Sequence, residues 1–440
     1  MRSTGASRGL AASPGKRRPP PRSAISGRLA ASAVAAVALA AALLATAPQA
    51  GAASLGTGAR QPHAASRPLT GAGVAFDATP SVWNGTDLVT TQIDPNGNLY
   101  AYEQVPGAAS WKKETVETAA ANGGAQFDPP SITAAGPAVQ IVAADTNGNI
   151  WFFQQTDGQT TWSAAQLVGS VGENTGTHEP QIAWTGVPGH TGTNSVITLA
   201  QGGNVLFWYQ NGGGWSQEKV ATGSEQNGYY DPAITATDKG IVIVAPGTSG
   251  AFFSFYQPYG GSGWVSDGSV GAGSNQYFSY VSATWDGVNV DVVAAFNSGF
   301  NDIIADKLVF LWKSNSARNW TDEDITGPTS TQPLDYTPAI AWTGSNLIVT
   351  AVQQMSSSSQ RIDFWWQGST FTNFNFEKVA TSASPTVFYP STLVSTHDAT
   401  SSGEIAIFAP VTTNNVTAAL DDWTQPTGEQ GWTKHTVTPA

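Results

Sequence analysis

The feature of this chain that most restricts its fold is a repeat of about fifty residues that occurs seven times. Each copy has an aromatic residue followed, five places later in all copies but one, by Val, Leu or Ile. The aromatic residues, spaced by 51, 53, 49, 56, 54 and 58 positions, are Trp111, Trp162, Trp215, Trp264, Trp320, Phe374 and Trp432. Repeats of this length bury their apolar residues between successive copies, because one copy alone is too small to form a core.

A second marker has the same period. In six copies a proline precedes a short apolar stretch, and in the fifth copy Val281 takes its place, followed by Trp285 and Gly287. The units therefore begin near residues 80, 130, 180, 232, 281, 338 and 390. Two independent markers agree on seven units.

Each unit contains four short runs rich in β-branched and aromatic residues, which are typical of strands. In the second unit the runs are "PSITAA", "VQIVAAD", "NIWFFQQ" and "WSAAQLV". Asn147-Gly148 joins the second run to the third, as Asn96-Gly97 does in the first unit, and this pair predicts a type I′ hairpin turn. Four strands per unit and seven units predict an all-β fold, a seven-bladed β-propeller with four antiparallel strands per blade.

The first 52 residues have the layout of a secretory signal peptide. Seven basic residues precede an Ala/Leu/Val run from Leu29 to Ala47, and Ala50-Gly51-Ala52 offers a small-residue cleavage site. An uncleaved membrane anchor is the alternative, because the run is about long enough to span a bilayer. We expect a signal peptide over 1–52, a disordered linker over 53–72, and a secreted propeller over 73–440 without a membrane span after cleavage.

Charge and composition narrow the range of partners. The full chain has 19 Lys and Arg against 31 Asp and Glu, and seven of the basic residues lie in the first 52 positions. The remaining chain carries a net charge of about −19, which repels phosphate backbones, so nucleic acid is not an expected partner. The chain has no cysteine, which excludes disulfides and thiol chemistry.

The hairpin segment "DPNGN" also places Asp94, Asn96 and Asn98 at alternate positions, as a calcium loop does. An EF-type loop needs Gly at its sixth position and Glu at its twelfth, whereas here Gly is fourth and Val105 is twelfth. We therefore favour a plain turn, and we expect no metal and no cofactor.

Two recurrent residue types are expected to be structural. If the four strands of a unit run from innermost (A) to outermost (D), four A–B turns begin with Trp-x-Gly, at Trp83, Trp184, Trp285 and Trp342. Strand C often ends in Gln, at Gln104, Gln155, Gln210, Gln257 and Gln367. Their recurrence favours a role in sealing one blade against the next or in satisfying backbone groups.

The D–A links have a pattern that fits ligand binding. An aromatic residue or His is followed by an acid and Pro in three links, and weaker copies occur in others. The candidate ligand-binding residues are Phe127, Asp128, His178, Glu179, Tyr230, Asp231, Tyr336 and Tyr389. An aromatic ring can stack on a sugar and a carboxylate can accept hydrogen bonds from its hydroxyls. The alternative is structural: the aromatic packs under the next blade, the acid caps backbone groups and Pro fixes the strand entry.

The sequence lacks residues that several kinds of catalytic site require. A sialidase needs converging arginines, and after the first 52 residues only Arg60, Arg67, Arg318 and Arg361 are present. No H-E-x-x-H zinc motif or G-x-S-x-G elbow occurs. A glycoside hydrolase with paired carboxylates in the central channel remains an open alternative. Its acids would come from the starts of the inner strands, at Asp77, Asp128, Glu179, Asp231 and Asp335.

Units such as "GNIWFFQQTDGQTTWSAAQLV" and "GNVLFWYQNGGGWSQEKV" resemble blades of secreted bacterial β-propeller lectins. The resemblance covers residues 80–440 and implies repeated sugar sites at the blade junctions. Fucose-binding members use an Arg/Glu/aromatic clamp in each site, and this chain has no repeated Arg, so no ligand residue is carried over.

We therefore expect a secreted, non-catalytic, monomeric binding module whose partner is a glycan or polysaccharide, bound through repeated inter-blade sites. The alternatives are a propeller-fold glycosidase with channel carboxylates and an extracellular platform for a cell-surface protein. Fold alone does not decide among them.

Overall fold

The computed structural model describes residues 80–437 apart from a set of gaps. The gaps are 105–109, 156–160, 172–178, 187–194, 212, 224–227, 272–275, 298–306, 315–316, 318, 326–337, 357–358, 368–372, 384–385, 390, 397–402, 414–415 and 427–430. The expected signal peptide and linker, and residues 73–79, lie outside the described residues. Residues 62–440 form one compact unit, and the fold below is that of this unit.

All regular elements of the described residues are β-strands, arranged in seven antiparallel sheets that we number as blades 1 to 7. Blades 1 to 4 consist of β1 (Ser81–Trp83), β2 (Leu88–Ile93), β3 (Leu99–Gln104) and β4 (Lys112–Glu117); β5 (Ser131–Ala135), β6 (Ala138–Ala144), β7 (Asn149–Gln155) and β8 (Gln166–Ser170); β9 (Gln181–Trp184), β10 (Ser195–Gln201), β11 (Asn204–Asn211) and β12 (Gly214–Ala221); and β13 (Ala233–Ala236), β14 (Gly240–Pro246), β15 (Phe252–Pro258) and β16 (Val265–Val270).

Blades 5 to 7 consist of β17 (Tyr277–Trp285), β18 (Asn289–Asn297), β19 (Lys307–Ser314) and β20 (Thr321–Asp324); β21 (Ala339–Trp342), β22 (Leu347–Ser356), β23 (Ser359–Gln367) and β24 (Phe374–Ala383); and β25 (Thr386–Phe388), β26 (Thr392–Ser395), β27 (Glu404–Thr413), β28 (Val416–Pro426) and β29 (Thr433–Val437). The described part of the chain contains no helix that could cross a membrane.

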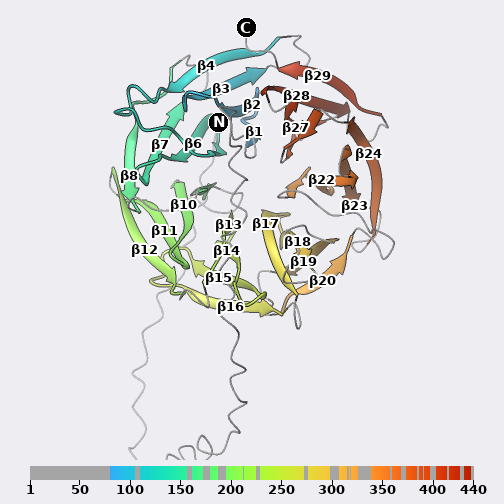
Figure 1. Cartoon of the computed structure of the whole chain (residues 1–440). Helices are drawn as coiled ribbons and strands as arrows, with labels where there is room; N and C mark the ends of the chain where they lie inside the picture. The colour runs from blue at the N-terminus through green and yellow to red at the C-terminus, as the bar shows by residue number, and fades with distance from the viewer. Residues whose placement is uncertain are drawn as a thin grey trace, which may run out of the picture. The chain divides into compact units, whose positions relative to one another are not determined.

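The sheets form a closed ring around a common axis, with the first strand of each sheet innermost (Figure 1). Each inner strand contacts the inner strands of its two neighbours, and β1 contacts β26 to close the circle. This arrangement confirms the all-β, seven-bladed β-propeller with four strands per blade. Blade 7 differs only in its inner edge, which is split between β25 and β26, both paired with β27.

Closure of the ring involves no exchange of strands among the described residues. Blade 1 is built only from β1–β4 and blade 7 only from β25–β29. The two are joined by side chains: Ser81 Oγ lies 2.9 Å from Thr392 Oγ1, and Leu88 and Tyr102 of blade 1 pack with Phe408 and Leu420 of blade 7. The closing junction is therefore of the same kind as the others.

The apolar core consists of seven clusters, one in each junction between neighbouring blades. Strand B supplies residues to both sides: in β18, Val292 and Ala294 belong to the cluster shared with blade 4, whereas Val293 and Ala295 belong to the one shared with blade 6. Alternate side chains of a strand point to opposite faces, so a fully buried sheet needs apolar residues at both parities.

The aromatic residue that marks each copy of the sequence repeat packs on the preceding blade. Trp215 meets Phe152 edge to face at 5.3 Å between ring centroids, and Trp264 meets Phe207 at 4.9 Å. The same contact closes the ring, where Trp111 meets Phe408 of blade 7 at 5.6 Å. The expected packing role of these aromatic residues is confirmed, and such pairs add about 0.5–1.5 kcal/mol beyond the buried area.

The hairpins at Asn96-Gly97 and Asn147-Gly148 differ from the expected two-residue type I′ turn. Gly97 N–H donates to Asp94 O at 2.9 Å, and Asp94 N–H donates to Asn98 O at 2.9 Å, so three residues form the loop. Pro95 sits where φ must be negative, and Gly97 has a φ of +78°. The turn is a type I turn followed by a left-handed glycine, the usual three-residue hairpin.

Carboxylates in these hairpins hold the turn. Asp94 Oδ1 accepts hydrogen bonds from the backbone N–H groups of Asn96 and Asn98, both at 2.9 Å. Asp145 does the same in blade 2 and also accepts the indole N–H of Trp151 at 2.8 Å. The Asp94 and Asp145 carboxylates thus accept hydrogen bonds from the N–H groups of their own turns, as the plain-turn interpretation requires.

Candidate binding site between blades 2 and 3

A polar contact recurs between neighbouring blades on the side of the A–B turns and C–D loops. A residue at or just before the end of strand C in one blade, usually Gln, reaches strand D of the preceding blade. Gln257 donates from Nε2 to Glu218 Oε2 at 2.9 Å, and Gln425 donates to Glu377 at 3.2 Å. The expected inter-blade role of these glutamines is confirmed for Gln257 and also for Gln155, which donates to Glu114.

Strand register shows that the carboxylates are equivalent. In each of three blades, the strand D carboxylate pairs with the strand C residue that lies three places before the Gln near the end of strand C. These carboxylates are Glu114, Glu218 and Glu377. In blade 4 the partner is Asp267, which forms an ion pair with Lys313, the residue that replaces Gln in blade 5. A carboxylate paired with a donor of the next blade is therefore the rule that four junctions follow: those of blades 1 and 2, 3 and 4, 4 and 5, and 6 and 7.

The junction between blades 2 and 3 departs from that rule. The residue of strand D that pairs with Phe152 is Gln166, where blades 1, 3, 5 and 6 carry Glu and blade 7 carries His435. Its counterpart at the end of strand C in blade 3 is Gln210. Two amides thus replace a carboxylate and an amide, and the charge of the junction is lost.

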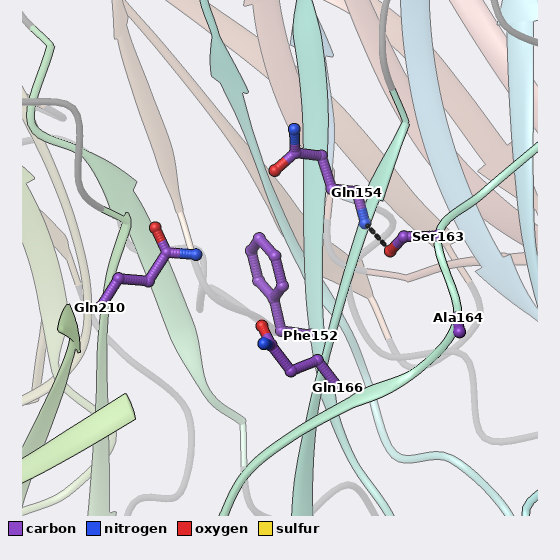
Figure 2. A pocket seen from close by; sticks show the side chains of 6 residues that line it. All are labelled: Phe152, Gln154, Ser163, Ala164, Gln166 and Gln210. Atoms are coloured by element: carbon purple, nitrogen blue, oxygen red, sulfur yellow. Dashed lines mark hydrogen bonds between the residues drawn. The ribbon is translucent and has the colours of Figure 1, made fainter. Parts of the chain in front are cut away.

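A cavity of about 320 Å³ opens at this place. Six residues line it: Phe152, Gln154, Ser163, Ala164, Gln166 and Gln210. Figure 2 shows the Phe152 ring between the three glutamine side chains. Ser163 and Ala164 are exposed and the glutamines are half-buried, whereas Phe152 is 4% exposed and forms the base. None of the six described residues that line the cavity is charged.

Hydrogen bonds inside the protein fix the polar groups of the cavity. Gln166 Oε1 accepts the indole N–H of Trp215 at 3.0 Å, and Gln210 Oε1 accepts the backbone N–H of Ser195 at 3.2 Å. Ser163 and Gln154 bond to each other twice, through Ser163 N–H to Gln154 O at 2.8 Å and Gln154 N–H to Ser163 Oγ at 2.9 Å. The cavity is therefore preorganised.

The residues predicted as ligand-binding lie on the opposite side, at the D–A links. Phe127 is 5% exposed and packs edge to face on Phe153 at 6.0 Å, and Asp128 N–H donates to Ala144 O at 2.9 Å. Phe127 corresponds in position to Tyr229, because each donates its N–H to the glycine of a B–C hairpin, Gly97 and Gly203 respectively.

The remaining predicted residues are distributed over several links. Tyr230 and Tyr389 are half-buried and donate their N–H groups to carbonyls of Pro246 and Pro410, at 2.9 and 3.0 Å. Glu179 and Asp231 are half-buried. His178 and Tyr336 lie outside the described residues. The structure leaves these residues in separate links of one face, and their role in binding stays a prediction.

The cavity residues were not predicted from the sequence as a binding site. Of the six, only Gln210 was singled out, as one of the glutamines that recur at the end of strand C. The available signal was the exception itself: Gln166 where the equivalent positions in blades 1, 3, 5 and 6 carry Glu. It was hidden because Glu114 and Glu218 follow the repeat's Trp by three places and Gln166 follows by four.

Comparison with known proteins gives likeness in architecture. No protein-family profile matches this chain, and no curated protein matches it. The six-bladed fucose-recognising lectin of the fungus Aleuria aurantia aligns with a TM-score of 0.46 and 16% identity, over 70% of this chain and 95% of that chain.

Two further solved structures align at similar levels. AofleA from Arthrobotrys oligospora gives a TM-score of 0.47 at 10% identity, over 70% of this chain and 86% of its own. SapL1 lectin, solved with α-methyl fucoside, gives 0.42 at 11% identity over 83% and 97%. The ligands named belong to those proteins, and no residue role is transferred from them.

Proposed function

We propose that this protein is a secreted, non-catalytic carbohydrate-binding protein and that the cavity between blades 2 and 3 is one of its sites. The observation that carries the proposal is an open, uncharged cavity lined by three amides and a hydroxyl, with Phe152 at its base. Small-molecule sites combine a few fixed polar groups with an apolar or aromatic surface in this way.

The chemistry of the lining suits a sugar better than an ion or an apolar ligand. Amide and hydroxyl groups can each make directed hydrogen bonds to ring hydroxyls without the desolvation cost of a buried charge. A volume of about 320 Å³ is at the small end of ligand sites, which span roughly 300–1,000 Å³, and corresponds to a short portion of a glycan. Affinity at such a site is expected to be modest.

The first test is titration with a panel of glycans and polysaccharides by calorimetry, with the same samples assayed for released sugar. Saturable binding without product supports the proposal. Released sugar would instead favour the glycosidase with channel carboxylates. No heat of binding with any member of the panel would refute a carbohydrate function and favour a protein partner.

Two variants locate the site. Ala164→Trp places a large side chain in the cavity from an exposed position without removing a hydrogen bond, so binding should be lost while the fold is kept. Asp231→Ala, on the opposite side, should leave binding at this cavity unchanged. Loss of binding with Asp231→Ala and not with Ala164→Trp would place the site at the D–A links instead.

Secretion is part of the proposal and rests on the basic and apolar segment before Ala53. Protein recovered from the culture medium should have its N-terminus near Ala53. Recovery of the intact chain in a membrane fraction would instead support an uncleaved anchor.

A further inference from the structure

The carbonyl oxygens of all three glutamines in the cavity are occupied within the protein. Gln166 Oε1 accepts from Trp215 Nε1 at 3.0 Å, Gln210 Oε1 accepts from Ser195 N at 3.2 Å, and Gln154 Oε1 accepts from Gln140 Nε2 at 3.3 Å. Two of these donors fix the amide orientation, because an indole N–H and a backbone N–H can only donate.

The amide nitrogens are left for a ligand. Among the described residues, none of the three Nε2 groups that line the cavity donates a hydrogen bond to a protein acceptor. Ser163 Oγ already accepts from Gln154 N–H at 2.9 Å, so its own hydrogen is also available. The cavity therefore presents three amide NH₂ groups and one hydroxyl, all as donors.

A comparison with the other junctions explains why the Gln210 amide nitrogen has no carboxylate acceptor. Where strand D carries Glu, the carboxylate accepts from the Gln of the next blade, as Glu218 does from Gln257 at 2.9 Å. Gln166 Oε1 accepts instead from the indole N–H of Trp215, and as a neutral amide oxygen it is a weaker acceptor than a carboxylate. The Gln210 amide of blade 3 thus loses the partner that its equivalents have.

We propose that the donor-rich cavity selects the acetamido group of an N-acetylated sugar, an inference that rests on the proposed carbohydrate function. The acetamido carbonyl would accept from the Gln166 and Gln210 amides, and its methyl group would lie against Ala164 and the exposed edge of Phe152. This assignment uses both the donors and the small apolar part of the lining.

Competing ligand groups fit less well. A carboxylate is a stronger acceptor, but the described lining residues include no Lys or Arg to compensate its charge, and removing an unpaired anion from water is costly. A plain hydroxyl must also donate its own hydrogen, and each amide oxygen that would receive it already accepts one hydrogen bond within the protein. A neutral group that accepts without needing an acceptor in return matches the site.

The test compares N-acetylglucosamine and N-acetylgalactosamine with glucose, galactose and glucuronate in calorimetric titrations of the full chain. The N-acetylated sugars should bind about tenfold or more tightly than their parent sugars, the effect of one or two added neutral hydrogen bonds. Equal affinity for glucose, or preference for glucuronate, would overturn the inference while leaving the carbohydrate function standing. Absence of binding by every sugar would refute both.

A matched pair of variants tests the residues. Gln166→Glu recreates the arrangement of the other junctions, so the carboxylate should capture the Gln210 amide and lower affinity for N-acetylated sugars about tenfold or more. The thermal midpoint should stay unchanged, since Trp215 retains an acceptor. The reverse change in the next junction, Glu218→Gln, should leave sugar affinity unchanged. Unaltered affinity in Gln166→Glu would contradict the proposed role of the amides.

Discussion

Asp291 is expected to destabilise the folded protein at neutral pH. It lies on β18 with no exposed surface, and neither carboxyl oxygen has a hydrogen-bond partner among the described residues. In blades 1, 3 and 6 the equivalent residues are Val89, Val196 and Ile348. Each of them, like Asp291, directly follows the strand B residue that pairs with the Trp of the A–B turn. An acid therefore occupies a position that is apolar in these three blades.

Burial raises the pKa of Asp291 from 3.8 to about 9, and the negative charge of Asp286 adds to the effect. The folded state keeps this proton at pH values where the unfolded chain has lost it. Stability therefore falls as pH rises from about 4 to about 9. Between pH 3.8 and pH 7, at about 1.36 kcal/mol for each pH unit, the loss in the free energy of unfolding amounts to about 4 kcal/mol.

Asp291→Val should recover this free energy, raising stability at pH 7 by up to about 4 kcal/mol. Denaturant titrations at pH 5, 7 and 8.5 measure both the gain and its growth with pH. Asp291→Asn separates two contributions, because it removes the titration but keeps a buried polar group. Equal stability of wild type and Asp291→Val at pH 5 and at pH 8.5 would refute the reasoning.

Two other predictions concern the packing and the hairpins. Trp432 meets Phe364 edge to face at 5.0 Å, so Trp432→Ala should lower the free energy of unfolding by about 3–5 kcal/mol, whereas Trp432→Phe, which copies blade 6, should cost less than about 1.5 kcal/mol. Denaturant titration would contradict the role of this contact if the two variants lost equal stability. Burial acts to raise the pKa of Asp145, but hydrogen bonds from Trp151 and Asn149 outweigh it and hold the pKa below 3.8. Asp145→Asn should therefore cost about 1–3 kcal/mol at pH 7, and the difference from wild type should shrink below pH 3.8 as Asp145 is protonated; a difference independent of pH would exclude this origin.

The propeller and its packing were predictable from sequence because both depend on residues that recur with the repeat. Trp215 and Trp264 occupy the same place in successive units and make the same contact with Phe152 and Phe207. Periodic apolar residues report burial whatever the details of the loops. The number of units and the antiparallel order follow from the same period.

The hairpins show where local sequence reasoning fails. Asn96-Gly97 favours a two-residue turn, but the Asp94 carboxylate accepts the N–H groups of Asn96 and Asn98 and so holds a three-residue loop open. Pro95 reinforces that choice, since its φ is negative. A side-chain hydrogen bond thus decided the turn against the propensity of the Asn-Gly pair.

The candidate site was not predictable for a different reason. Its defining residue, Gln166, matters only in comparison with Glu218 and Glu114, and the comparison requires knowing that all three occupy one register across the strands. The number of residues between the repeat Trp and that position changes between blades. Spacing along the chain therefore did not reveal which residues share a row across the sheet.

Closure of the ring has a consequence for how the fold comes apart. A linear array of n repeats has n − 1 interfaces and two end repeats that can fray separately. In this ring β1 meets β26, so every repeat has two neighbours and none is terminal. Unfolding of the first blade therefore disrupts two interfaces at once, whereas unfolding of an adjacent blade afterwards disrupts only one more. The free-energy cost of unfolding is larger for the first blade than for the next. The closed ring therefore resists local fraying until one blade has unfolded. The remaining blades then behave as an open array, whose ends can fray separately.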